Sequence, residues 1–98
     1  MAYEIVWTDN INEDIDDILS YLESVASHKV AEKFLNELRE KVSVLTKFPE
    51  SGRQSQKDET VRSLLFRKRY WVFYTIIGQE IIMLDIFDTR QDPSKRPY

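Results

Sequence analysis

Arginine and tyrosine are the residue types in this chain whose spacing suggests chemistry. Arg62 opens one apolar segment, Arg69 and Tyr70 open the next, and Arg90 follows the last. In an antiparallel meander we expect Arg62 and Arg90 to lie at the same end of the sheet. Guanidinium groups gathered at one rim suit the recognition of phosphate. The alternative interpretation is that these arginines only keep the strand ends soluble.

Other kinds of catalytic site find no support in the residue content. The chain has no cysteine and a single histidine, His28, at the expected start of a helix. Neither a nucleophilic triad nor a thiolate metal site can be assembled from these residues. The two glycines, Gly52 and Gly78, stand too far apart to form a phosphate-cradling loop. The sequence therefore predicts no metal and no cofactor.

The aromatic residues of the segment 70–74 could stack on nucleic-acid bases or pack in a core. They alternate along the expected strand, with Trp71 and Phe73 on one face and Tyr70 and Tyr74 on the other. This alternation favours packing of one set against the helices, while the other set stays partly open. An open aromatic face on a small domain usually marks a partner.

The charges of this 98-residue chain are segregated, although its net charge is only −3. Residues 1–28 hold seven acidic residues and no lysine or arginine, and all 14 basic residues follow. The acidic stretch can simply be a solvated helix face, whereas the basic remainder is where an anionic partner could act. We see no signal peptide and no apolar run long enough to span a bilayer, so we expect no membrane partner and a cytoplasmic location.

Two helices are expected in the first half of the chain, where apolar residues recur with a helical period. Asn10 and Glu13 resemble a capping box that starts the first helix. Ser27 can cap the second helix. Phe48 and Pro49 end it, because proline restricts the residue before it.

The remaining segments predict a sheet. A polar loop over residues 49–60 contains Gly52, which we expect in a backbone conformation closed to residues with a Cβ. Gly78 and Gln79 form a hairpin turn, and we expect the polar tail 88–98 to be loosely held. The expected strands cover residues 3–7, 61–66, 70–77 and 80–87. The sequence thus predicts a single α+β domain over residues 1–98, an antiparallel helix hairpin on a mostly antiparallel four-stranded sheet in the order β-α-α-β-β-β.

Short motifs occur along the chain in the order and spacing of a known family. A Phe-Pro-x-x-Gly-Arg turn precedes an arginine at a strand start, a Tyr-x-Val-x-Tyr strand and an Asp-x-Arg-x-x-Pro end. Over nearly the whole chain this pattern resembles the RelE/ParE superfamily of toxins from type II toxin–antitoxin systems, which includes plasmid stabilisation proteins. The residues that carry the resemblance are Phe48, Pro49, Gly52, Arg53, Arg62, Tyr70, Val72, Tyr74, Asp88, Arg90 and Pro93.

The resemblance implies one of two activities. RelE-like members are ribosome-dependent mRNA endoribonucleases, and in such an enzyme Arg62, Arg90 and Tyr98 would be the catalytic candidates. ParE-like members inhibit DNA gyrase without a reaction of their own. Leu64 and Trp71 occupy positions where the nuclease set is basic, and many relatives have histidine in place of Asp88. These departures favour the ParE-like interpretation, with an inactive toxin relic as a further alternative.

The resemblance also implies partners. A cognate antitoxin would neutralise the toxin in a hetero-oligomer, and we expect it to add to a sheet edge and to an apolar strip around Leu64, Phe66 and Trp71. The tail from Arg90 to Tyr98 is expected to contribute to gyrase inhibition. The residues expected to contact partners are Arg53, Arg62, Leu64, Phe66, Arg69, Trp71, Arg90, Lys95 and Arg96.

Overall fold

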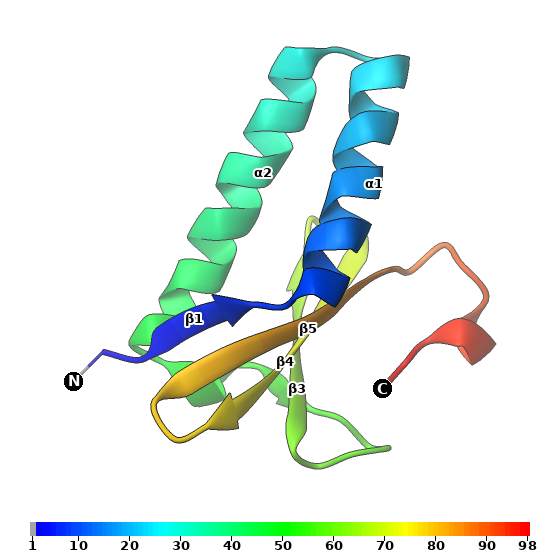
Figure 1. Ribbon diagram of the computed structural model, residues 1–98. Helices are drawn as coiled ribbons and strands as arrows, with labels where there is room; N and C mark the ends of the chain where they lie inside the picture. The colour runs from blue at the N-terminus through cyan, green and yellow to red at the C-terminus, as the bar shows by residue number, and fades with distance from the viewer. Residues whose placement is uncertain (1) are drawn as a thin grey trace.

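A computed structural model of the chain describes residues 2–98 as an α+β fold, with two helices packed on a mixed five-stranded sheet (Figure 1). None of the helices in these residues is long and apolar enough to cross a membrane. The sheet order is β1-β5-β4-β3-β2. The elements are β1 (Glu4–Trp7), α1 (Asp9–Val25), α2 (His28–Ser43), β2 (Arg53–Gln54), β3 (Val61–Phe66), β4 (Tyr70–Ile77) and β5 (Glu80–Asp88), with 3₁₀ turns at Val44–Thr46, Pro49–Ser51 and Pro93–Lys95.

The sheet contains one more strand than the sequence predicts. β2 is only two residues long and lies inside the segment expected to be a polar loop, where it pairs antiparallel with β3. β3, β4 and β5 form the expected antiparallel meander, and β1 pairs parallel with β5. The order is therefore β-α-α-β-β-β-β, and the predicted helix hairpin is confirmed (Figure 1).

The helix ends are partly as predicted. Ser27 caps α2, because its side chain accepts a hydrogen bond from the backbone N–H of Val30. The predicted capping box at Asn10 is wrong: Thr8 caps α1 by accepting from the Ile11 N–H. Asn10 lies inside the helix, and its amide donates to the carbonyl of Leu84 at 2.9 Å. α2 also ends at Ser43, before the proline, and continues only as a 3₁₀ turn.

The main core lies between the helix pair and one face of the sheet. Ile11 of α1 and Phe34 and Leu38 of α2 are almost completely buried there. From β4, Val72 and Tyr74 reach the same core. The face of β4 that meets the helices is therefore the one that carries Tyr70, Val72 and Tyr74.

The C-terminal tail covers the opposite face of the sheet, so the expectation of a loosely held tail is wrong. The ring of Tyr98 packs 5.2 Å from the ring of Phe73, and the Arg96 guanidinium lies 4.9 Å from the centre of the Trp71 ring. Phe73 is completely buried under this cover, together with Val61 and Phe87. The aromatic face expected to stay partly open is thus covered at Phe73 by the chain itself, whereas Trp71 stays partly exposed.

Gly52 is required for space, and the predicted special backbone conformation is wrong. Its φ of −73° and ψ of 155° suit any residue. A Cβ at this position would overlap the hydroxyl of Tyr74. That hydroxyl accepts from the Gly52 N–H at 2.9 Å and donates to the Pro49 carbonyl at 2.7 Å. One buried tyrosine therefore fastens the loop after the helices to the central strand.

We expect Gly52→Ala to lower the free energy of unfolding by about 1–3 kcal/mol, because the added methyl group must displace a buried ring. Gly78→Ala is the control. Gly78 has a φ of 60°, and a Cβ added there would meet no other atom. The substitution should therefore cost only the backbone strain, about 1–2 kcal/mol. Denaturant unfolding of both variants measures the difference. A smaller loss at Gly52 than at Gly78 would contradict the steric role of Tyr74.

Candidate functional site

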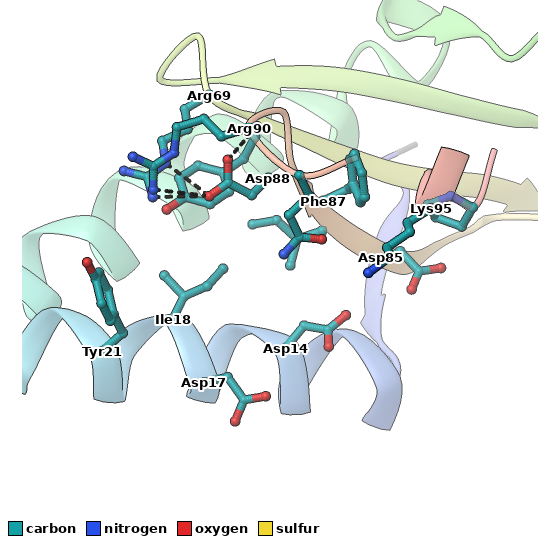
Figure 2. Close-up of a pocket in the computed structure, with 14 residues that line it drawn as sticks. Asp14, Asp17, Ile18, Tyr21, Arg69, Asp85, Phe87, Asp88, Arg90 and Lys95 are labelled. Carbon is teal, nitrogen blue, oxygen red and sulfur yellow. Dashed lines mark hydrogen bonds and ion pairs between the residues drawn. The ribbon is translucent and has the colours of Figure 1, made fainter. Parts of the chain in front are cut away.

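A groove of about 660 Å³ lies between α1 and the segment formed by the end of β5 and the C-terminal tail (Figure 2). One wall carries acidic side chains of α1 and the other carries cations of the tail and of the β3–β4 connection. Apolar side chains of Ile18, Tyr70 and Ile86 lie between the two walls. The residues that line the groove are Asp14, Asp17, Ile18, Tyr21, Arg69, Tyr70, Asp85, Ile86, Phe87, Asp88, Arg90, Gln91, Lys95 and Pro97.

Two of the predicted arginines meet on the basic wall through a shared carboxylate. Arg69 donates to one oxygen of Asp88 from Nε at 3.2 Å and from a terminal nitrogen at 3.0 Å. Arg90 approaches the same oxygen at 3.5 Å, and its backbone N–H donates to the other oxygen at 2.9 Å. Asp88 is mostly buried, whereas the side chain of Arg90 is 65% exposed. Asp88 therefore holds both guanidinium groups at the rim and leaves Arg90 open to a partner (Figure 2).

Arg62 does not join this cluster, so the expectation that Arg62 and Arg90 share one end of the sheet is wrong. β3 and β5 both pair antiparallel with β4 and so run in the same direction. Arg62 stands near the start of β3, whereas Arg90 follows the end of β5. The Arg62 side chain donates to the backbone carbonyls of Glu50 at 3.2 Å and Gly52 at 2.8 Å. It thus anchors the loop after α2.

The groove holds two carboxyl groups with raised pKa values, Asp14 on the acidic wall and Asp85 on β5. Burial raises the pKa of Asp14, and the nearby carboxylates of Asp85, Asp17 and Glu13 raise it further. Burial also raises the pKa of Asp85, although a hydrogen bond from the Asn10 amide at 2.5 Å opposes that rise. Sequence reasoning missed this wall, and its only signal was the excess of acidic residues in the first 28 positions.

The predicted apolar strip of Leu64, Phe66 and Trp71 does not exist as one surface. Leu64 and Phe66 pack into the core under the helices, and Phe66 is only 4% exposed. Trp71 lies on the opposite face of the sheet with Phe73. Successive side chains of a strand point to opposite faces of the sheet. Trp71 is paired with Leu65, so it shares a face with Leu65 and not with Leu64 or Phe66.

The other predicted residues divide between two places. Lys95 lines the groove with Arg69 and Arg90. Arg53, Trp71, Arg96 and Tyr98 border a separate cavity on the helix-free face of the sheet. Sequence reasoning missed Lys57 and Ser63, which line this second cavity. Within residues 2–98 no three histidine, cysteine or acidic side chains are arranged to hold a metal ion.

The raised pKa values of the acidic wall predict how stability depends on pH. A carboxyl group whose pKa is higher in the folded chain than in the unfolded chain destabilises the fold when it ionises. The loss of stability begins as the pH rises through the pKa of the unfolded chain and is complete above the pKa of the folded chain. We expect Asp14→Asn to raise the melting temperature at pH 7 by about 2 °C. The gain should vanish as the pH falls towards 3.8, the ordinary pKa of aspartate.

Asp16→Asn provides the matched control, because the substitution removes the same unit charge from the same helix. Asp16 is exposed and does not line the groove. Thermal unfolding of both variants between pH 3 and pH 8 makes the comparison. Equal gains at the two positions, or a gain of Asp14→Asn that persists at pH 3, would contradict the crowding of carboxylates at this wall.

Comparison with known proteins identifies the family. No curated protein sequence matches the chain. The structure is similar to one from the chromosomal ParDE toxin–antitoxin system of P. aeruginosa, with a TM-score of 0.77 and 23% identity over 89% of this chain and 96% of that one. It is also similar to a conserved hypothetical protein of Helicobacter pylori, with a TM-score of 0.56 and 15% identity over 91% and 97% of the two chains. The model of the ParE toxin of the type II toxin–antitoxin system parDE matches residues 5–93, and the chain therefore belongs to the ParE toxin family.

Proposed function

We propose that this ParE-family toxin inhibits growth by binding DNA gyrase, without catalysis of its own, and that a cognate antitoxin neutralises it in a cytoplasmic hetero-oligomer. One observation carries the choice against a nuclease: Arg62 and Arg90, the cations that a nuclease would use, lie at opposite ends of the sheet. Arg62 is also engaged by two backbone carbonyls. Phosphoryl transfer needs cations that converge on one phosphate.

The positions of Leu64 and Trp71 support the same choice. Leu64 packs into the core and offers neither charge nor proton. Trp71 is covered by the Arg96 guanidinium, so one face of its ring is already engaged. Tyr98, the remaining nuclease candidate, packs on Phe73, and burial raises the pKa of its hydroxyl. A phenol with a raised pKa is a poorer general base at neutral pH.

The groove between α1 and the tail is the surface that best suits the antitoxin. Its basic wall presents the exposed Arg90, and apolar side chains such as Ile18 lie beside it (Figure 2). The groove follows α1 from Asp14 to Tyr21, which suits a helix or an extended segment. An antitoxin segment with acidic side chains on one flank would place them beside Arg69, Arg90 and Lys95. Binding of this kind can reach nanomolar affinity, or about −12 kcal/mol.

Two assays separate the gyrase and ribosome mechanisms. We expect the purified protein to inhibit gyrase supercoiling and to cause no mRNA cleavage above background in translating ribosomes. A double variant with Arg62→Ala and Arg90→Ala is the control. An RNA-cleaving activity that disappears in this variant, while its cooperative thermal unfolding shows that it still folds, would show that the nuclease interpretation is right.

Truncation after Pro93 tests the role of the tail in the same assays. It removes Lys95, Arg96 and Tyr98, and we expect gyrase inhibition to be lost. Growth inhibition that survives the truncation would refute the role of the tail, while the family assignment would stand.

The antitoxin surface is tested by charge reversal. We expect Arg90→Glu to weaken binding of the protein encoded by the adjacent reading frame by roughly tenfold, because an acidic segment would meet a like charge in the groove. Arg39→Glu makes the same change of charge at an exposed position of α2 outside the groove. Calorimetric titration of both variants gives the affinities. Equal weakening by the two substitutions would place the antitoxin elsewhere.

A further inference from the structure

A second cavity, of about 300 Å³, lies on the helix-free face of the sheet beneath the C-terminal tail. Its volume is at the lower end of the range for small-molecule sites. The side chains that give it chemical character are Arg53, Lys57, Ser63, Trp71, Arg96 and Tyr98. The family assignment and the proposed antitoxin groove do not use this cavity, and of the tail proposed to act on gyrase it contains Pro93, Arg96 and Tyr98.

The sheet register builds the floor of this cavity. Arg53 of β2 pairs with Ser63 of β3, and Ser63 pairs with Phe73 of β4. Residues paired across antiparallel strands point to the same face and lie about 5 Å apart at their Cβ atoms. A guanidinium, a hydroxyl and a buried aromatic ring are therefore aligned across three adjacent strands. The alignment is fixed by backbone pairing, so it does not depend on a flexible loop.

The hydroxyl of Ser63 is an unused hydrogen-bonding group in the wall of this cavity. Ser63 is only 5% exposed and is the one polar residue of the core in residues 2–98. Its side chain makes no hydrogen bond with another residue in this part of the chain. Every side-chain nitrogen or oxygen in residues 2–98 that is inaccessible to solvent has a hydrogen-bond partner. The Ser63 oxygen has no such partner, so it must be accessible, and the cavity that Ser63 lines provides that access. A hydroxyl that opens into a cavity and has no protein partner is free to donate to a group bound there.

The ionised side chains that line this cavity are positive. They are Arg53, Lys57 and Arg96, and among residues 2–98 no aspartate or glutamate lines the cavity, in a chain of net charge −3. Within residues 2–98 none of the three forms an ion pair with an acidic side chain. Arg53 lies beside the hydroxyl through its pairing with Ser63. These cations therefore favour an anionic ligand.

Arg96 is held in place for this task. Its guanidinium lies over the rings of Trp71 and Phe73, 4.9 Å and 5.4 Å from their centres. Its Nε donates to the backbone oxygen of Tyr98 at 2.8 Å, and its own carbonyl accepts from Lys57 at 3.3 Å. Neither terminal nitrogen of the guanidinium makes a hydrogen bond within residues 2–98, so both are available to a ligand. The partly exposed rings of Trp71 and Tyr98 provide apolar walls beside it.

We propose that this cavity binds a phosphate-bearing ligand with a planar ring, of which a nucleoside monophosphate is the simplest example. The phosphate accepts hydrogen bonds from Ser63, Arg53 and Arg96. The ring packs against Trp71 and Tyr98, because aromatic side chains stack on nucleobases irrespective of base identity. Cations and an aromatic wall at one small cavity give two separate sources of affinity.

Fluorescence of Trp71 provides a direct test. The chain has two tryptophans, and Trp7→Phe leaves Trp71 as the only reporter. We titrate this background with AMP, adenosine and inorganic phosphate. AMP should change the fluorescence with a submillimolar dissociation constant, and each of the other two should bind at least tenfold more weakly. An AMP dissociation constant above about 1 mM overturns the proposal, as does equal binding of AMP and adenosine or of AMP and phosphate.

Two variants locate the ligand. We expect Ser63→Ala and Arg53→Gln each to weaken AMP binding about tenfold, because each removes a donor to a charged group. Ser20→Ala and Arg39→Gln make the same chemical changes at exposed helix positions and should leave binding unchanged. Arg53 is exposed, so its variant keeps the test valid if Ser63→Ala changes the fold. Binding that is unaffected by both cavity variants refutes the site.

Discussion

The burial of β4 on both faces is the constraint on which the rest of this structure depends. Val72 and Tyr74 face the helices, Phe73 faces the other way, and all three are completely buried. A strand that is apolar on both sides needs cover on both sides. The helix pair supplies one cover, and the C-terminal tail supplies the other through Tyr98. The path of the tail over the sheet then forms the second cavity and brings Lys95 to the groove.

Much of the fold was predictable from the sequence, because the spacing of hydrophobic residues within a segment indicates whether that segment is a helix or a strand. The helix hairpin and the bounds of β3 and β4 follow from it directly. The errors concern features that depend on distant residues. Thr8 and not Asn10 caps α1 because the Thr8 hydroxyl also donates to the Met83 carbonyl on the neighbouring strand β5 at 2.7 Å. Gly52 is needed because of a tyrosine 22 residues away, and no pattern near Gly52 reveals that.

The candidate sites were less predictable than the fold. The separation of Arg62 from Arg90 follows from strand direction alone. In the expected meander the first and third strands run in the same direction, so the start of one and the end of the other lie at opposite ends of the sheet. The engagement of Arg62 by two carbonyls did not follow, since it needs the folded position of the Pro49–Ser51 turn. Charge segregation indicated an acidic helix but not which cations face it. Ser63 was invisible as a site residue, because a serine within an apolar strand carries no signal until its partners are known.

The distribution of charge decides which kind of partner the groove can accept. Asp88 partly neutralises Arg69 and Arg90, so the basic wall has a defined geometry with little excess charge. The opposite wall presents Asp14 and Asp17, and burial together with neighbouring carboxylates raises the pKa of Asp14. A polyanion such as mRNA would be repelled by that wall and would gain little from counterion release. An amphipathic protein segment can set acidic side chains against Arg90 while its apolar side covers Ile18 and Tyr21. The physical design of the groove thus favours a protein partner over a nucleic acid.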